Sequence, residues 1–419
     1  MLSRGARIAV IGDGHAGLSL ASAAVAASFS VNLFRADGEP LKAQAREAER
    51  LPLEIAIAPD AAVSTAGVKL GTSEGALPEN DVICLCPPED EGRAAPSNLE
   101  TACRAVARGL RSGSLVIVVA GLSPGATGGP VRALLETSGL LAGRDFLLAC
   151  SPDRTDTLTK PSGSWELPRV VGGLTPEATG LAALFYRQLV DQVVVVSSSK
   201  AAELVQLLSD ASGQVNAALV NEMAMVSREA GVDVWEVVEA ASTGQSGSPR
   251  LDPGLVDTDA ASLELRYATS NRDGGSPRLR ILEQAREINA RMGEYIASRI
   301  ADALNDAGKA VKGASILILG VSSVTGPSGR SATIGVMNKL SRQGARVSYH
   351  DPHVRALSLD GSSRPRIELT QRAISGQDCV AILAAHDAYD RDWLSAHASL
   401  VFDASNVFTS DRRPNVVPL

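Results

Sequence analysis

The fold is decided by one stretch near the start of the chain, Ile8-Ala9-Val10-Ile11-Gly12-Asp13-Gly14-His15-Ala16-Gly17. Its four apolar residues predict a buried strand, and the Ala-rich segment 18–27 that follows predicts a helix. The three glycines fit the pattern G-x-G-x-x-G, which binds a dinucleotide when it lies between a strand and a helix. Gly12 permits the tight turn, Gly14 the close approach of pyrophosphate and Gly17 close packing of helix on strand, while free amides at the helix start meet the phosphates. The stretch therefore predicts a dinucleotide site, and the alternative is a turn inherited from a binding ancestor.

The residues around this fingerprint leave the choice of cofactor open. Asp13 brings a carboxylate beside the expected pyrophosphate, and two like charges 4 Å apart repel by roughly 4 kcal/mol at an effective dielectric of about 20. Arg35 follows the strand predicted at 31–34, where an acid for the ribose hydroxyls of NAD is usual. It either favours the 2′-phosphate of NADP or is a solvated edge residue. We expect NAD or NADP to bind at Gly12, Gly14, His15, Ala16, Gly17, Arg35 and Pro87, although His15 is more readily explained as a turn residue with its ring in solvent.

Short β-rich runs alternate with helical stretches through the first half of the chain. Strands are predicted at residues 8–11, 31–34, 81–86, 115–119 and 146–150. This order is typical of βαβ units, in which helices cover both faces of a parallel sheet. A second series of the same kind begins after Gly313, with strands at 315–319, 346–349, 379–383 and 400–403 and a helix at 331–343.

Long helices are predicted between the two series, at residues 200–230 and 279–307, with a shorter one at 232–241. The segment 242–277 is rich in Gly, Ser, Asp and Pro and is predicted to be a long loop. At ~1.5 Å per residue the helix at 279–307 is long enough to link two domains. We therefore expect an α/β protein with two Rossmann-like parallel-sheet domains joined by a long central helix, divided at 1–198, 199–308 and 309–419.

Composition excludes several classes of partner. Of 419 residues, 40 are Lys or Arg and 47 are Asp or Glu, so the net charge is −7, a poor match for nucleic acid or an anionic membrane. No apolar stretch approaches the ~20 residues that span a bilayer, and the first residues contain no leader-like apolar segment. The five cysteines fit neither a disulfide framework nor a zinc site, and the histidines have no metal-ligand spacing. We expect a reduced, cytoplasmic protein without a metal.

Beyond the fingerprint, the chain resembles the nucleotide-sugar dehydrogenases, the UDP-glucose/GDP-mannose and UDP-N-acetylmannosamine dehydrogenase family. The strongest match runs from Ala202-Glu203-Leu204 through Val215-Asn216-Ala217-Ala218-Leu219-Val220-Asn221-Glu222-Met223-Ala224. Others are Ser151-Pro152-Asp153-Arg154, Ala285-Arg286-Glu287-Ile288-Asn289, Tyr349-His350-Asp351-Pro352 and His386-Asp387-Ala388-Tyr389-Asp390. The resemblance implies an N-terminal dinucleotide-binding domain, a central helical region that forms a homodimer, and a C-terminal domain for a nucleotide sugar. It also implies substrate contacts at Asn216 and Arg330.

This family oxidises a sugar alcohol to the acid with two NAD, through an aldehyde that a cysteine thiolate captures as a thioester. The matching positions have changed in this chain. No cysteine lies between Cys150 and Cys379, although the family's nucleophile follows Pro253-Gly254. The family's active-site lysine falls at Gln206, its asparagine partner at Asp210 and its glutamate at Asp153. These three positions are the degenerate equivalents of the catalytic residues, and the alternative is that they are solvated polar positions.

Three hypotheses for function follow from these losses. The first is an NAD(P)-dependent oxidoreductase that moves a single hydride on a sugar or nucleotide sugar, with a carboxylate such as Asp153, Asp210 or Asp259 as base. The second is a catalytically inactive pseudoenzyme that binds a nucleotide sugar or a partner subunit. The third is non-redox chemistry in a specialised biosynthetic pathway. The loss of several catalytic positions together argues against the four-electron oxidation to the acid.

Overall fold

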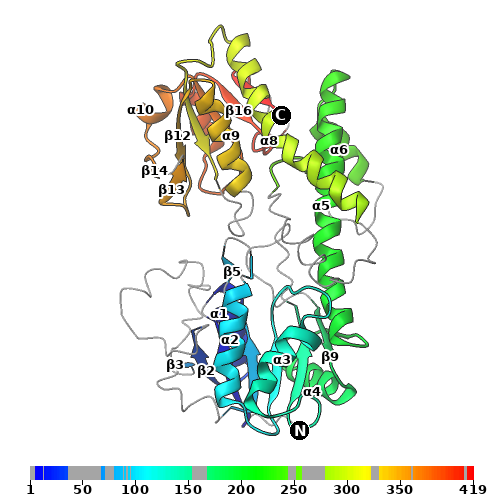
Figure 1. Ribbon diagram of the computed structural model, residues 1–419. Coiled ribbons are helices and arrows are strands. Elements are labelled where there is room, and N and C mark those ends of the chain that lie inside the picture. The colour runs from blue at the N-terminus through cyan, green and yellow to red at the C-terminus, as the bar shows by residue number, and fades with distance from the viewer. Residues whose placement is uncertain are drawn as a thin grey trace. The chain divides into compact units, whose positions relative to one another are not determined.

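The computed structural model describes residues 5–12, 14–35, 68–70, 80–87, 89–90, 93–94, 96–152, 168–243, 252–256, 279–321, 330–359, 362–409 and 413–419 (Figure 1). The described residues fall into two compact units, one up to Ser209 and the other from Asp210 onward. Helix α5 (Ser199–Glu229) contributes to both units. The three-part division at 198/199 and 308/309 remains a prediction.

The first unit is built on an eight-stranded sheet with the strand order β10-β9-β8-β7-β4-β1-β2-β3. Its strands are β1 (Arg7–Ile11), β2 (Ser30–Phe34), β3 (Val68–Leu70), β4 (Val82–Leu85), β7 (Leu115–Val118), β8 (Leu147–Cys150), β9 (Arg169–Gly173) and β10 (Val193–Val195). The six neighbouring strands β8, β7, β4, β1, β2 and β3 are parallel to one another, which confirms the prediction from the alternating pattern. Strand β9 runs antiparallel to β8 and was not predicted. An apolar run reads the same in a buried strand of either direction, so the sequence pattern does not reveal this reversal.

Helices cover both faces of this sheet, because its central strands bury alternate residues on opposite sides. Val10 packs in a core with α1 (His15–Ala26) and α4 (Pro176–Tyr186). Its neighbour Ile11 packs in a separate core with α2 (Pro96–Gly109) and α3 (Arg132–Leu135). Cys84 and Cys86 lie in the first of these cores, on one face of the sheet as their spacing predicts.

The second unit contains a five-stranded parallel sheet with the order β12-β11-β15-β16-β17. Its strands are β11 (Ser315–Leu319), β12 (Arg346–His350), β15 (Cys379–Ile382), β16 (Val401–Asp403) and β17 (Val416–Pro418). Ile316 and Ile318 pack against α8 (Arg280–Asp306) and α9 (Arg330–Arg342), and Leu317 and Leu319 pack toward α10 (Gln371–Ser375) and α11 (Arg391–His397).

The long helices predicted between the two series are confirmed, but the helix at 279–307 lies within the second unit, and α5 is the helix shared by both units. Helix α5 begins one residue before the predicted 200–230 and ends one residue before its end, and α8 covers all but the ends of 279–307. The short helix α6 (Val234–Ser242) starts where the Asp233 carboxylate accepts a 3.0 Å hydrogen bond from the amide of Trp235. Of the predicted loop at 242–277, residues 242, 243 and 252–256 are described, and the rest lies outside the described residues. The architecture is the predicted α/β class with parallel, Rossmann-like sheets.

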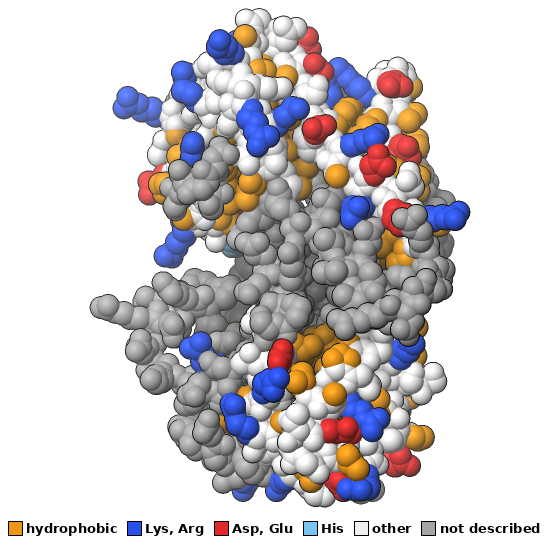
Figure 2. All heavy atoms as spheres, in the orientation of Figure 1, with side chains coloured by type: hydrophobic (Ala, Val, Ile, Leu, Met, Phe, Trp, Pro, Cys, Tyr) orange, Lys and Arg blue, Asp and Glu red, His pale blue; other side chains and the backbone are white. Residues whose placement is uncertain are grey.

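Basic and acidic side chains are interspersed over the face shown in Figure 2. Within the described residues, no helix is both long enough and apolar enough to cross a bilayer.

Candidate functional site

The fingerprint glycines lie where β1, β4 and α1 approach most closely. Gly12 has a φ of +130°, and a Cβ added there would lie 1.7 Å from the backbone oxygen of Cys86. A Cβ on Gly17 would lie 2.0 Å from the backbone oxygen of Gly12. The amide of Gly12 donates to Phe34 O at 2.8 Å, and the amide of Cys86 donates to Ile11 O at the same distance. Glycine is therefore required at both positions, which brings the start of α1 onto the carboxyl edge of the sheet.

The start of α1 offers amide donors for a phosphate group. Gly14 is the N-cap residue in an extended conformation, and no side-chain hydrogen bond from the described residues caps the helix. The first turn contains no acidic residue. Uncapped amides and the positive end of the helix dipole suit an anionic group such as a pyrophosphate. These described residues fit the dinucleotide that the fingerprint predicts.

The other predicted cofactor positions border the same edge. Ala16 lies in the first turn of α1 and is partly buried, Pro87 follows β4 and is buried, and Arg35 follows β2 and is exposed. His15 is the first residue of α1, and its side chain lies outside the described residues, as does Asp13. Strands β1 and β4 are neighbours in the sheet although they are not consecutive in the chain, and ligands of open α/β sheets bind at such a switch point.

The predicted catalytic positions lie mainly on α5. Gln206 and Asp210 are one helical turn apart and partly buried, and Asn216 is partly buried farther along the same helix. Asp153 lies outside the described residues. Arg330 is the first residue of α9, but its side chain is not among those described. The catalytic and substrate roles of these residues therefore remain predictions.

A chain of side-chain amides fixes the segment 252–256, which includes Pro253-Gly254. The amide of Gly254 donates to Asn221 Oδ1 at 2.8 Å, and Asn221 Nδ2 donates to Asn289 Oδ1 at 3.0 Å. Asn289 Nδ2 then donates to the backbone oxygen of Gln214 at 3.0 Å. The first donor in this series of hydrogen bonds is a backbone N–H, and the last acceptor is a backbone C=O. The orientation of both buried asparagine amides is therefore determined. The segment that resembles the start of the family's nucleophile loop is thus bonded to α5 and, through Asn221, to α8.

All five cysteines of the chain are free and buried. Burial raises the pKa of the Cys103 and Cys379 thiols to about 12. Burial raises the pKa of Cys84 and Cys150 further still. A thiolate is the nucleophilic form of cysteine, so these four thiols are poorly suited to attack a substrate, and Cys86 is buried as well.

Sequence reasoning assigned no role to Glu203, which the structure places close to the same edge of the first sheet. Its side chain is fully buried, Oε1 accepts a 2.8 Å hydrogen bond from the amide of Thr127, and Oε2 accepts one from the amide of Gly125. Burial raises the pKa of this carboxyl above that of an ordinary glutamate. In the sequence, Glu203 is a single acidic residue next to Ala202 near the start of a predicted helix, and this position does not indicate its partners.

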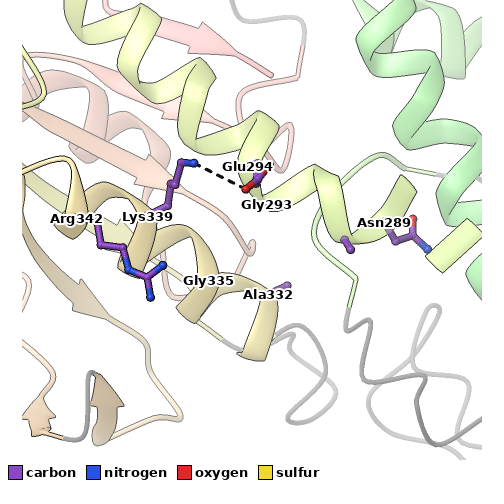
Figure 3. Close-up of a pocket in the computed structure, with 8 residues that line it drawn as sticks. Asn289, Gly293, Glu294, Ala332, Gly335, Lys339 and Arg342 are labelled. Carbon is purple, nitrogen blue, oxygen red and sulfur yellow. Dashed lines mark ion pairs between the residues drawn. The ribbon is translucent and has the colours of Figure 1, made fainter. Parts of the chain in front are cut away.

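A cavity of about 290 Å³ lies between α8 and α9 in the second unit (Figure 3). Its lining residues are Asn289, Ala290, Gly293, Glu294, Ala332, Gly335, Lys339 and Arg342. Lys339 Nζ lies 3.7 Å from Glu294 Oε1. The small residues make room between the helices, and the charged ones border the opening.

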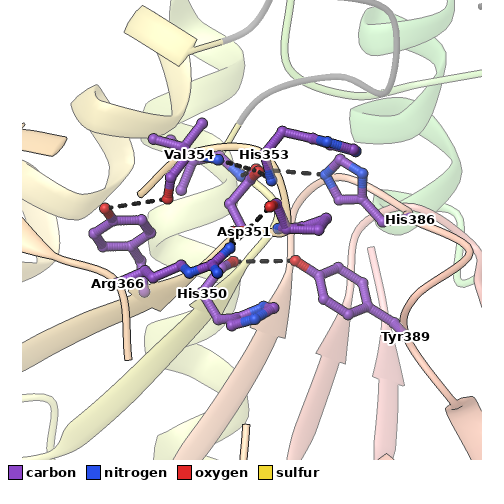
Figure 4. Close-up of polar contacts among 10 residues, drawn as sticks. His350, Asp351, His353, Val354, Arg366, His386 and Tyr389 are labelled. Carbon is purple, nitrogen blue, oxygen red and sulfur yellow. Dashed lines mark hydrogen bonds and ion pairs between the residues drawn. The ribbon is translucent and has the colours of Figure 1, made fainter. Parts of the chain in front are cut away.

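Two segments that carry the family resemblance meet at the carboxyl edge of the second sheet (Figure 4). Asp351 is fully buried and accepts hydrogen bonds from the amides of Val321 at 2.8 Å, His353 at 2.8 Å and Val354 at 3.0 Å. His386 Nε2 lies 3.4 Å from Asp351 Oδ2.

The same two segments make a second contact, in which the Tyr389 hydroxyl donates to His350 O at 3.0 Å. Burial lowers the pKa of His350 and raises that of Tyr389. The contacts of Asp351 and Tyr389 fix the backbone at the ends of β11 and β12. Among the described residues, no group of three or more His, Cys, Asp or Glu side chains could hold a metal ion.

Three segments of the chain match models of one protein family, the UDP-glucose/GDP-mannose dehydrogenase family. Its NAD binding domain matches residues 6–190, its central domain residues 200–291 and its UDP binding domain residues 329–410. The UDP-N-acetyl-D-mannosamine dehydrogenase of Pyrococcus horikoshii is 28% identical over 337 residues, which cover 78% of this chain and 77% of that protein. The enzyme of the same name from Methanocaldococcus jannaschii is 25% identical over 432 residues, covering 97% and 94%.

Solved structures agree with this match at the level of the fold. The UDP-D-ManNAc dehydrogenase structure from Pyrococcus horikoshii superimposes with a TM-score of 0.77 at 23% identity and covers 98% of each chain. A UDP-glucose dehydrogenase from Pyrobaculum islandicum gives a TM-score of 0.75 at 23% identity, covering 95% of this chain and 94% of that one.

Proposed function

Because the chain belongs to the UDP-glucose/GDP-mannose dehydrogenase family, we propose that it is an NAD(P)-dependent oxidoreductase that moves a single hydride on a sugar or nucleotide sugar. In this proposal the four-electron oxidation to the acid is absent. The observation that carries it is the burial of every cysteine in the chain. A thioester forms only when a thiolate reaches the substrate aldehyde, and every one of these thiols is buried.

The described residues of the fingerprint support binding of the dinucleotide cofactor that the family uses. The glycine contacts at β1 and the uncapped amides of α1 support a bound dinucleotide, which supplies a hydride acceptor or donor. Arg35 is exposed and follows β2 at this edge, where the 2′-phosphate of NADP would lie, so both NAD and NADP remain candidates. The family's UDP binding domain, matched at 329–410, supports a nucleotide sugar as the ligand.

Proton transfer then needs a base among the residues that replaced the family's catalytic set. Asp210 is the described candidate, since it is partly buried on α5 and carries a carboxylate. Asp153 and Asp259 are further candidates from the sequence. A carboxylate that accepts the alcohol proton is sufficient for a single oxidation to the aldehyde or ketone.

The replacement of two catalytic positions favours a second candidate, a non-catalytic homologue that binds a nucleotide sugar or a partner subunit. Gln206 cannot supply the cation of the family's lysine, and a carboxylate at Asp210 repels a developing alkoxide. Non-redox chemistry in a specialised biosynthetic pathway remains the third candidate.

An exposed apolar face on α5 supports the homodimer that the resemblance implied. Leu219, Met223 and Val226 follow one another at helical spacing and are 55%, 38% and 50% exposed. Such a face is usually covered in the assembled protein, and a second copy of this chain is the proposed occupant. The free state of every cysteine suits a reducing, cytoplasmic location.

The test is the stoichiometry of cofactor reduction. The purified protein is incubated with NAD or NADP and a panel of UDP- and GDP-sugars, and reduced cofactor and sugar products are quantified together. One reduced cofactor per sugar, with an aldehyde or ketone product, is expected. Treatment of the native protein with a thiol-alkylating reagent should leave this activity unchanged.

Two reduced cofactors per sugar, with an acid product, would overturn the proposal. Tight binding of a nucleotide sugar with no cofactor reduction would select the non-catalytic homologue instead. A product formed without any redox change would select the third candidate.

A further inference from the structure

Glu203 joins the start of α5 to the loop that follows β7. The two carboxylate oxygens accept hydrogen bonds from the amides of Gly125 and Thr127, which are separated by one residue. The side chain is 0% exposed. A buried carboxylate with two backbone partners fixes both the side chain and the backbone that donates to it.

The loop that Glu203 holds lies at the carboxyl edge of the cofactor-binding sheet. It begins directly after β7, which neighbours β4, and β4 neighbours β1 with its glycine fingerprint. A dinucleotide crosses such a sheet so that one mononucleotide lies on each half, on either side of the switch point. With the pyrophosphate at α1, the half formed by β4 and β7 receives the nicotinamide nucleotide.

The electrostatic surroundings of Glu203 make this contact sensitive to pH. Burial raises the pKa of the carboxyl, and the hydrogen bonds from Thr127 and Gly125 and the charge of Lys200 offset part of that rise. The buried Cys150 thiol of β8 also interacts with this carboxyl. When Glu203 is protonated, one of its two carboxyl oxygens carries a proton and no longer accepts a hydrogen bond from an amide. One of the two amides therefore loses its partner.

We propose that Glu203 is a positioning residue of the cofactor site, which fixes the backbone at residues 125–127 and with it the loop against which the nicotinamide half of the dinucleotide lies. This inference rests on the proposed function, because it requires that NAD or NADP binds. It adds a residue outside the glycine fingerprint whose charge state controls cofactor affinity.

The experiment compares Glu203→Gln with Glu229→Gln, an equivalent change at an exposed glutamate of the same helix. NADH affinity is measured by fluorescence titration between pH 5 and pH 8, and amide hydrogen exchange of residues 120–127 is measured in parallel. A glutamine offers one acceptor oxygen where the carboxylate offers two, so Glu203→Gln should bind NADH about tenfold more weakly at neutral pH. The exchange of the Gly125 or Thr127 amide should become faster, and Glu229→Gln should match the wild type.

The pH profile separates positioning from a merely structural role. The wild-type affinity should fall on acidification, beginning above the pH at which an ordinary glutamate protonates, while Glu203→Gln should show no such fall. An unchanged NADH affinity in a folded Glu203→Gln protein would overturn the inference. A wild-type affinity that stays constant on acidification until the protein itself unfolds would also overturn it, even if the variant does not fold.

If the wild type binds neither NADH nor NADPH, the proposed function fails. Hydrogen exchange then decides the inference about the loop separately, because unchanged protection of Gly125 and Thr127 in Glu203→Gln would refute it without reference to any cofactor.

Discussion

Replacing Gly12 by alanine should break the contact between β1 and β4 and abolish dinucleotide binding. The new Cβ would lie 1.7 Å from Cys86 O and 2.6 Å from Cys86 C, where an ordinary contact is roughly 3.5 Å. Both are backbone atoms of a buried residue, so no side chain can rotate away. Alanine is also strained at a φ of +130°, which costs on the order of 1–3 kcal/mol.

The overpacking adds about 1–3 kcal/mol or more, and together the two effects cost about 4 kcal/mol. For a unit of this size that corresponds to a fall in Tm of roughly 10 °C. Tm is measured by circular dichroism or calorimetry, and NADH binding by fluorescence titration below the Tm of the variant. The expected result is a large fall in Tm and no NADH binding.

The matched control is Gly180→Ala. Gly180 lies in α4, is exposed, and an added Cβ there meets no atom within 4 Å. Alanine is a better helix former than glycine by up to about 1 kcal/mol, so the control should keep or raise Tm and bind NADH as the wild type does. A Gly12→Ala protein with unchanged Tm and NADH affinity would refute the argument that glycine is required where the end of β1 lies against the backbone of Cys86.

Three further substitutions test contacts within the second unit. Asn221→Asp removes the donor to Asn289 and should destabilise the protein by about 2 kcal/mol in urea unfolding; an unchanged midpoint would contradict the amide chain. Asp378 is bonded to Lys309 at 2.6 Å and to the Ser315 amide at 2.8 Å, and the Lys309 contact is the main cause that lowers its pKa. Its ionised form therefore stabilises the folded state above the pKa of an unfolded aspartate, and Asp378→Asn should cost about 1 kcal/mol at pH 7. That difference should shrink as the pH falls below about 4, and a constant difference in urea unfolding at pH 7 and pH 3 would contradict the reasoning. Ile318→Ala should cost about 2–5 kcal/mol by the same assay, because the side chain is fully buried between the second sheet and its helices; a cost below about 1 kcal/mol would show that the core relaxes around the cavity.

The features that follow from local chemistry were predictable from the sequence. A strand, three glycines and an Ala-rich helix predict the β1–α1 turn, because the steric need for glycine acts over a few residues. The long helices α5 and α8 follow from apolar spacing in the same way. The antiparallel direction of β9 does not, since Val170-Val171 would be apolar in either direction.

The contact between Glu203 and Thr127 could not be predicted from the sequence either, because the two residues lie 76 positions apart. The amide chain through Asn221 and Asn289 joins positions 68 apart and has the same cause. Such pairs depend on how helices pack on the sheet rather than on any local pattern. The resemblance pointed to the segments that contain Glu203, Asn221 and Asn289 but not to their contacts.

The most direct measurement is a calorimetric titration of cofactor-free protein with NADH and then with NADPH. Binding of either at micromolar concentration is expected, because the glycine contacts and the open start of α1 fit a dinucleotide. A preference for NADPH would assign Arg35 its role at the ribose. No heat with either compound at millimolar concentration, for protein shown to be folded, would contradict the claim that this edge of the sheet is a working cofactor site.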